Sequence, residues 1–158
     1  MNKEITDVYN FLQEIAWHFG NHGISGRCCG NLTLVEFMAL KRVYENPDIS
    51  IQEIGNALNF TKSGATRIIN RLEEKGYAKR QNSDIDGRVC CVSITPKGTA
   101  MIKSVMLNYT NYLEELLKGL EQKEVENIKD TLEILVKAIQ LNKPFESEII
   151  LEEGNAYG

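Results

Sequence analysis

The sequence predicts a mainly α-helical protein with one small β-hairpin, a fold of the α+β class. Two observations lead to this prediction. Apolar residues recur at intervals of three and four over most of the chain, which is the spacing of one helix face. A single segment, Val89–Thr95 (VCCVSIT), is instead rich in β-branched residues, and a polar turn separates it from another short candidate strand.

The composition is typical of a globular protein. The chain has 158 residues, of which 42% are hydrophobic and 25% charged, enough for one compact domain or two closely packed lobes. No apolar run approaches the roughly 20 residues that span a bilayer, and the acidic, amphipathic N-terminus does not resemble a signal peptide. We therefore expect a cytoplasmic protein with no membrane partner, whose four cysteines are mostly reduced unless they have a redox or metal role.

The first two predicted helices are separated by a glycine-rich loop. The first helix runs to about His18–Asn21, because apolar residues recur on one face: Ile5, Val8, Leu12, Ile15, Ala16 and Phe19. The loop that follows, NHGISGRCCGN, contains glycines that interrupt a helix. Thr33 and Glu36 then have the spacing of a capping box, which predicts a second helix to about Glu45.

Two further helices follow a turn at residues 46–48. Ser50 and Glu53 form a second predicted capping box, which opens a short helix with three inward residues: Ile51, Ile54 and Leu58. The next segment, TKSGATRIINRLEEKG, has one apolar stripe: Ala65, Ile68, Ile69 and Leu72. Its remaining face carries side chains that suit base edges and phosphates: Ser63, Thr66, Arg67, Asn70 and Arg71. Gly76 is placed to end this helix.

A hairpin comes after the basic helix. Its predicted strands are Tyr77–Gln81 and Val89–Thr95, and the polar turn Asn82–Arg88 connects them. A short helix, a tight turn and a helix with a polar outer face together form a helix-turn-helix, and the hairpin behind it forms a wing.

Two long helices complete the predicted fold. Thr95 and Pro96 begin a helix that continues to about Gly119. The apolar stripe Val125–Ile139 predicts a last helix that ends before Pro144. This stripe is longer than one small core requires, which indicates that it covers a partner.

Positive charge is concentrated in one short part of this acidic chain. The formal net charge is −4, yet Thr61–Arg80 contains six cations and two anions and so carries +4, which leaves −8 on the rest. The cations are Lys62, Arg67, Arg71, Lys75, Lys79 and Arg80. A local basic patch indicates a polyanionic partner at one place, although charge alone is equally compatible with a solvated helix face.

At this point the sequence resembles the MarR family of winged-helix regulators. The matching text is IQEIGNALNFTKSGATRIINRLEEKGYAKR followed by DIDGRVCCVSITPKG. The helix spacing matches over about Leu32–Gly98, and the flanking helices fit the family's dimerisation lobe. The most specific part of the resemblance is Asp86-Gly-Arg88 together with Ser93–Gly98.

The resemblance implies a homodimeric repressor that an effector releases from a pseudo-palindromic DNA operator. Residues 32–98 would bind DNA, residues 1–31 and 99–141 would form the dimerisation lobe, and residues 142–158 would be a flexible tail. The basic helix would enter the major groove, and Arg88 of the wing, oriented by Asp86, would enter the minor groove. The implied DNA-binding residues are Thr61, Lys62, Ser63, Gly64, Thr66, Arg67, Asn70, Arg71, Arg80, Asp86 and Arg88. The alternative for Asp86 and Arg88 is a turn ion pair of little energetic weight.

The four cysteines form two adjacent pairs, Cys28-Cys29 and Cys90-Cys91. This is not the C-x-x-C spacing of a zinc finger or a thioredoxin motif. Neighbours in a strand point to opposite faces, so we expect one of Cys90 and Cys91 in the core and the other outward.

The cysteines suggest a hypothesis for the effector. The adjacent thiolates, with a further thiolate or the imidazole of His18 or His22, would bind a thiophilic metal or metalloid ion or respond to an oxidant. The alternatives are cysteines that act as small hydrophobic residues and histidines at the surface. The family's peroxide sensors have a cysteine early in the first helix and its zinc sensors have histidines after the wing. This chain has neither, so those mechanisms do not carry over.

Enzymatic activity is not expected. No histidine follows residue 22, and we find no nucleophile elbow, P-loop or dinucleotide fingerprint. Three alternatives remain: a winged-helix protein-interaction module, a thiol oxidoreductase built on the cysteine pairs, and a regulator that senses a small organic ligand while its cysteines are structural. Steep loss of binding with added salt distinguishes a DNA partner from a protein partner.

Overall fold

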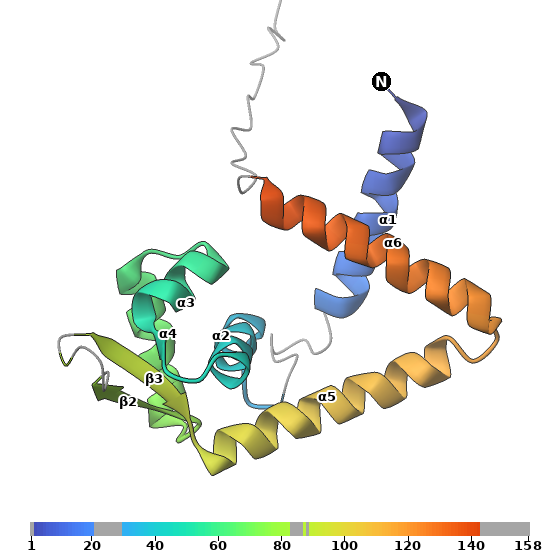
Figure 1. The fold of residues 1–158 in the computed structure, drawn as a ribbon. Coiled ribbons are helices and arrows are strands. Elements are labelled where there is room, and N and C mark those ends of the chain that lie inside the picture. Colours follow the sequence, from blue (N-terminus) through green and yellow to red (C-terminus); the bar gives the residue numbers. More distant parts are fainter. Residues whose placement is uncertain (1, 21–29, 83–86, 88, 143–158) are drawn as a thin grey trace, which may run out of the picture. The chain divides into compact units, whose positions relative to one another are not determined.

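The computed structural model describes residues 2–20, 30–82, 87 and 89–142, and the chain divides into two compact units, Met1–Glu114 and Glu115–Gly158. The strands lie in the first unit (Figure 1). Along the chain the elements are α1 (Lys3–Gly20), α2 (Leu34–Glu45), β1 (Ile49–Ser50), α3 (Ile51–Leu58), α4 (Lys62–Glu74), β2 (Ala78–Asn82), β3 (Cys90–Ile94), α5 (Pro96–Leu116) and α6 (Gln122–Leu141). The predicted fold class, mainly helical with a small hairpin, is confirmed.

The hairpin strands belong to a three-stranded antiparallel sheet of order β1-β3-β2. Val92 of the central strand pairs with Ile49 of β1, and Ile94 pairs with Ala78 of β2. Strand β1 was not predicted, because two residues are too few to show a period of two. Its second residue, Ser50, is also the N-cap of α3, and the sequence pattern indicated only this capping role.

Side-chain caps fix the starts of two helices where the sequence predicted them. Thr33 and Glu36 form a reciprocal capping box at the start of α2. Ser50 and Glu53 form the same arrangement at α3. The predicted first helix is confirmed as α1, whereas α5 ends at Leu116, before the predicted limit.

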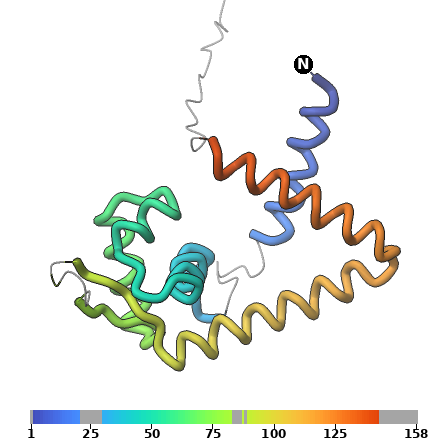
Figure 2. Tube along the Cα trace, in the orientation of Figure 1, coloured from blue at the N-terminus to red at the C-terminus, as the bar shows by residue number. Residues whose placement is uncertain are grey.

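One hydrophobic core holds the sheet and the helices α2 to α5 together in the first unit. The sheet and these helices are called the lobe below, and Figure 2 traces the path of α2, α3 and α4 within it. Its largest fully buried side chains come from most of these elements: Leu32, Leu40, Val43, Ile54, Ile69, Leu72, Val92 and Ile102. Helix α5 contributes through its first half, by Ile102 and Val105. The core therefore determines which face of α4 is turned outward.

The first turn of α5 packs on the segment that follows α4. The side-chain amine of Lys97 donates to the carbonyl oxygen of Lys75 over 2.8 Å and lies 5.0 Å from the centre of the Tyr77 ring. Thr95 caps α5, since its Oγ1 accepts from the Gly98 N–H at 3.0 Å. A Cβ atom on Gly98 would lie 2.1 Å from the carbonyl oxygen of Tyr77, so this close approach requires glycine.

A buried ion pair joins the start of α2 to the end of α4. Glu36 is 2% exposed, and its Oε2 accepts from Lys75 Nζ at 2.7 Å and from the Thr33 N–H at 2.9 Å. Lys75 Nζ also donates to the Asn31 carbonyl oxygen over 2.8 Å. Burial alone would raise the pKa of Glu36, but the hydrogen bonds from Lys75 and Thr33 outweigh it, so its pKa is lowered.

In the second unit, the described helix is α6, in agreement with the predicted last helix. The N–H of Glu121 donates to the Glu124 carboxylate over 2.8 Å at its start. None of its side chains is buried, and its exposed apolar residues include Ile128, Leu132, Ile134, Val136 and Ile139. Within the described ranges no helix is long and apolar enough to cross a membrane.

Acid should weaken the fold through Glu36. Because its pKa is lowered on folding, its contribution to stability is full above the ordinary carboxyl pKa and is lost as the pH falls through the folded value. We expect Glu36→Gln to lower the free energy of unfolding by about 1–3 kcal/mol at pH 6. The difference from the unsubstituted protein should shrink towards pH 3, as measured by urea denaturation across this range.

The matched control for this experiment is Glu74→Gln. Glu74 is an exposed carboxylate near the end of α4, so its removal should change stability little at either pH. Equal acid sensitivity in Glu36→Gln and the unsubstituted protein would show that the buried pair does not set the pH dependence.

Candidate nucleic-acid interface

The turn between α3 and α4 is tight because backbone atoms approach each other without an intervening side chain. Asn59 ends α3 in the left-handed region, at φ 57°, a conformation that asparagine tolerates better than most residues. The Phe60 N–H then donates to the Gly55 carbonyl oxygen at 2.9 Å. A Cβ on Gly55 would lie 3.0 Å from the Phe60 carbonyl oxygen, so glycine allows the two helices to meet closely.

Helix α4 begins at a threonine cap and buries one stripe. The Thr61 hydroxyl accepts from the Gly64 N–H at 3.1 Å. All four residues of the predicted apolar stripe are buried: Ala65, Ile68, Ile69 and Leu72. The opposite face of α4, which the sequence predicted to be polar, therefore does not pack against the core.

The outward face of α4 carries a shallow open hollow. It is lined by Lys62, Ser63, Thr66 and Arg67, and Asn70 and Arg71 are exposed on the following turn. The Thr66 hydroxyl donates to the Lys62 carbonyl oxygen at 2.8 Å, which leaves its oxygen available as an acceptor. The face therefore combines cationic, donor and acceptor groups at helical spacing.

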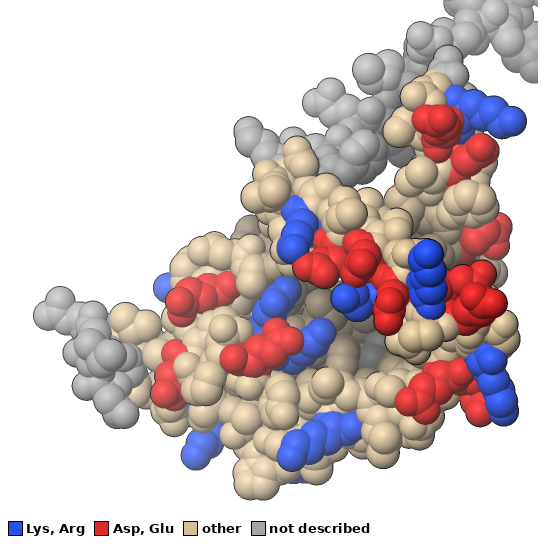
Figure 3. All heavy atoms as spheres, turned by 45° about the vertical axis from the view of Figure 1, so that its right-hand side comes forward, with Lys and Arg blue, Asp and Glu red and all other residues tan. Residues whose placement is uncertain are grey.

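The predicted basic patch is smaller than the sequence indicated. Lys75 points inward to Glu36, and Arg80 forms an ion pair with Glu73. The cations exposed in this segment are Lys62, Arg67, Arg71 and Lys79. On the face of the molecule drawn in Figure 3, basic and acidic side chains are mixed.

Arg80 connects the sheet to α4. Its guanidinium bonds the Glu73 carboxylate and donates to Asn70 Oδ1 over 2.5 Å, and its backbone N–H donates to Glu73 Oε1 over 2.7 Å. A longer contact of 3.5 Å reaches the Thr66 carbonyl oxygen. Arg80, predicted as a DNA contact, is thus engaged within the lobe.

The base of the wing is held by Gln81. Its amide nitrogen donates to the Asp48 carboxylate, and its amide oxygen accepts from the Ser93 hydroxyl at 3.3 Å. Arg88, predicted to enter the minor groove, and Asp86, predicted to orient it, lie outside the described residues.

The cysteines and histidines are only partly described. Cys91 is buried, at 5% exposed, as predicted for one member of the pair, whereas Cys90 is half-buried and packs against the core instead of pointing fully outward. His18 lies against Tyr112, with their rings stacked at 6.0 Å. Cys28, Cys29 and His22 lie outside the described residues. Among the residues that are described, no three His, Cys, Asp or Glu side chains are grouped to hold a metal.

An apolar hollow lies between α1, α2 and α5 in the first unit. Its lining is Ile15, Ala16, Phe19, Gly20, Leu34, Phe37 and Tyr109. The tyrosine hydroxyl is the one side-chain polar group in this lining. The hollow therefore suits an apolar or aromatic molecule better than an ion.

Sequence reasoning missed the inward cations, although signals for both were present. Lys75 follows Leu72 by three residues, which continues the buried stripe of α4. Arg80 lies two residues after the buried Ala78 and so on the same face of β2.

Known proteins resemble this chain most clearly over the segment that contains α3 and α4. The model of the MarR family matches residues 32–90, which contain the helix-turn-helix. The HTH-type transcriptional regulator PapX of Escherichia coli is 34% identical over 108 residues, or 68% of this chain. Residues 32–90 form a MarR-family domain.

The likeness to known proteins extends beyond residues 32–90. The transcriptional repressor MprA of Escherichia coli strain K12 is 32% identical over 120 residues, or 73% of this chain. The matches span 62% of PapX and 66% of MprA, less than two thirds of either protein. A MarR family protein from Bacillus stearothermophilus has the same fold, with a TM-score of 0.75 at 21% identity, over 89% of this chain and 99% of that one.

Proposed function

We propose that this protein is a DNA-binding transcriptional regulator, and that it acts as a repressor in the cytoplasm. The observation that carries the proposal is the outward face of α4, where Lys62, Arg67 and Arg71 accompany small polar residues on a helix-turn-helix. Glu and Lys suffice for solubility, whereas arginine and short polar side chains suit phosphates and base edges. MprA, to which the chain is similar, is named a transcriptional repressor.

In this proposal α4 enters the major groove, and the wing contacts the adjacent minor groove. Residues 32–98 form the DNA-binding domain. Arg67 reaches a base edge, Lys62 and Arg71 bind phosphates, and Arg88 enters the minor groove beside Asp86. The alternative partner, another protein, would bind the same face with weaker salt dependence.

Removing the arginine side chains should separate binding from folding. We expect Arg67→Ala to weaken operator binding by about 1–3 kcal/mol with little change in melting temperature, since Arg67 is exposed. Leu72→Ala should instead lower stability by about 2–5 kcal/mol, because Leu72 is fully buried.

The measurement is fluorescence anisotropy on a selected operator at several salt concentrations, paired with thermal unfolding. The assignment fails if Arg67→Ala and Arg71→Ala both bind DNA as the unsubstituted protein does. Binding that does not weaken with salt would favour a protein partner instead.

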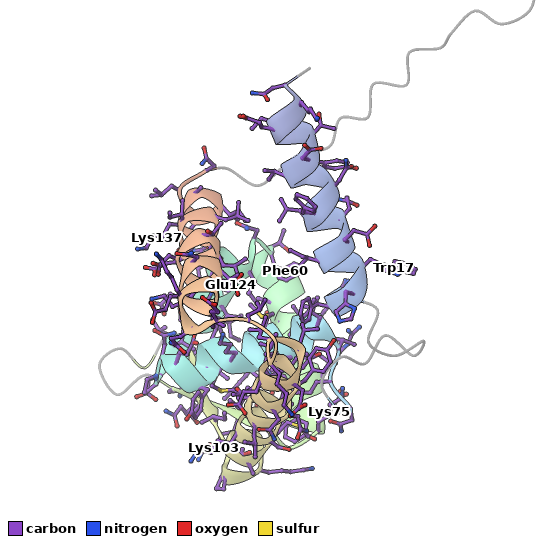
Figure 4. All side chains as sticks on the ribbon, turned by 90° about the vertical axis from the view of Figure 1, so that its right-hand side faces the viewer. Trp17, Phe60, Lys75, Lys103, Glu124 and Lys137 are labelled. Carbon is purple, nitrogen blue, oxygen red and sulfur yellow. The ribbon has the colours of Figure 1, made fainter. Side chains whose placement is uncertain are left out.

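We further propose a homodimer built from residues 1–31 and 99–141. Helix α1 has no buried residue, and its exposed apolar side chains include Ile5, Val8, Phe11 and Trp17. Figure 4 shows Trp17 pointing away from its helix, and it is 70% exposed. Helix α6 exposes a further apolar set, and surfaces of this kind rarely stay uncovered in water.

A charge placed on the apolar side of α1 should weaken the dimer. We expect sedimentation to give a dimer at micromolar concentration and Phe11→Asp to dissociate it, because Phe11 is 67% exposed in the single chain. Gln13→Asp introduces the same charge at an exposed polar position and should leave the dimer intact. A stable, folded monomer of the unsubstituted protein at this concentration would refute the proposal.

The effector has two candidates that rest on different parts of the chain. The first is a thiophilic ion or oxidant sensed at Cys28 and Cys29, where adjacent thiolates suit a soft metal or arsenite. The second is an organic molecule in the apolar hollow that Ala16 and Phe37 help to line. Either ligand has to bind one conformation better than the other to release DNA.

Gel-shift titrations should discriminate between these effectors. We expect arsenite to release the protein from DNA at far lower concentration than salicylate-like acids, and the Cys28→Ser/Cys29→Ser double variant to lose this response. Ala16→Leu fills part of the hollow and should leave the arsenite response unchanged. If the double variant dissociates at the same arsenite concentration as the unsubstituted protein, the cysteine pair is not the sensor. Release by a neutral aromatic probe that Ala16→Leu abolishes would then establish the second candidate.

A further inference from the structure

Asn70 and Arg80 form a polar contact between α4 and the wing. Arg80 Nη2 donates to Asn70 Oδ1 over 2.5 Å, while Nη1 bonds the Glu73 carboxylate. The chemistry of the guanidinium fixes the orientation of the amide. Because a guanidinium has only donors, the Asn70 atom that faces it has to be the oxygen.

This contact leaves one half of the Asn70 amide for a partner. With Oδ1 bound to Arg80, the Nδ2 group and its two N–H donors form the other branch of the planar amide. Asn70 is exposed, and it follows Arg67 and Thr66 of the outward hollow by one turn. The free donors therefore belong to the face proposed to contact DNA.

Arg80 itself is poorly suited to bind a phosphate. Glu73 neutralises its charge, and both partners of this ion pair are 29% exposed at their side chains. Its two terminal nitrogens are already directed at the carboxylate and the amide of α4. A guanidinium held in this way acts through the side chains that it orients.

We propose that Arg80 is a positioning residue which makes Asn70 a hydrogen-bond donor towards the operator, so that Asn70 selects a base with acceptors on its major-groove edge. The proposal rests on the proposed DNA-binding function. An unrestrained asparagine pairs with adenine by using its oxygen and its nitrogen together. With the oxygen engaged, adenine keeps only one of these two bonds, at its N7 acceptor. Guanine and thymine, whose major-groove edges present acceptors and no amino donor, are then favoured over cytosine, which presents a donor.

The test is the selection of sequences from a randomised DNA duplex pool by the full-length protein and its variants. Asn70→Asp keeps an oxygen for Arg80 but replaces the outward amide with an acceptor. We expect this variant to change the preferred base at one position of each half-site, from guanine or thymine to cytosine, by about tenfold in relative affinity. Asn70→Ala should lose the preference at that position and keep it elsewhere.

Arg80 is tested by two variants that separate positioning from phosphate binding. Arg80→Lys keeps the charge without the planar fork and should relax the preference at the Asn70 position alone. Arg80→Gln should leave the salt dependence of binding to random DNA unchanged, whereas loss of a phosphate contact would lower its slope by about 1. Thermal unfolding of each variant checks that the lobe stays folded.

The outcomes distinguish this inference from the function on which it rests. If the unsubstituted protein selects no sequence and binds without salt dependence, both proposals fall. If it selects a sequence that Asn70→Asp selects equally, or if Arg80→Gln lowers the salt slope, only the positioning of Asn70 by Arg80 is overturned. A base change confined to one position in Asn70→Asp, with the same position relaxed in Arg80→Lys, supports it.

Discussion

The buried contact between Glu36 and Lys75 is the interaction on which the placement of α4 depends. It joins the first turn of α2 to the residue that ends α4, at a site where the Glu36 carboxylate is almost fully removed from water. Removal of either partner would leave an uncompensated charge or an empty polar site in the lobe. Since Lys75 also donates to the Asn31 carbonyl oxygen, this contact ties the segment before α2 to the end of α4.

A second set of contacts holds α4 from the side of the sheet. Arg80 reaches across from β2 to Glu73 and Asn70, and Gln81 on the same strand links the Asp48 carboxylate to Ser93. The helix is therefore fixed at its end by α2 and along its length by the hairpin. A rigid scaffold of this kind positions its exposed groups more accurately than a loop does, and the buried polar contacts leave the outward face to external partners.

The sequence predicted the parts of the fold that follow from local rules. The caps at Thr33 and Ser50 and the buried stripe of α4 each depend on residues a few positions apart, so they are visible in one segment. The inward positions of Lys75 and Arg80 depend on partners 39 and seven residues away, respectively. Charge counting treats every cation as solvated, and so it overestimated the basic surface. The apolar hollow needs residues from three helices, which no local pattern relates to one another.

The contact of Gly98 with Tyr77 has a mechanical consequence. Most joints between helices contain side chains, which absorb small displacements by changing rotamer. Here a helix backbone lies directly against a carbonyl oxygen, where even a methyl group would overlap it. Backbone atoms in such a contact cannot change rotamer, so a tilt of the first turn of α5 directly displaces the segment that follows α4. The contact between Gly98 and Tyr77 therefore couples the start of α5 rigidly to the end of α4.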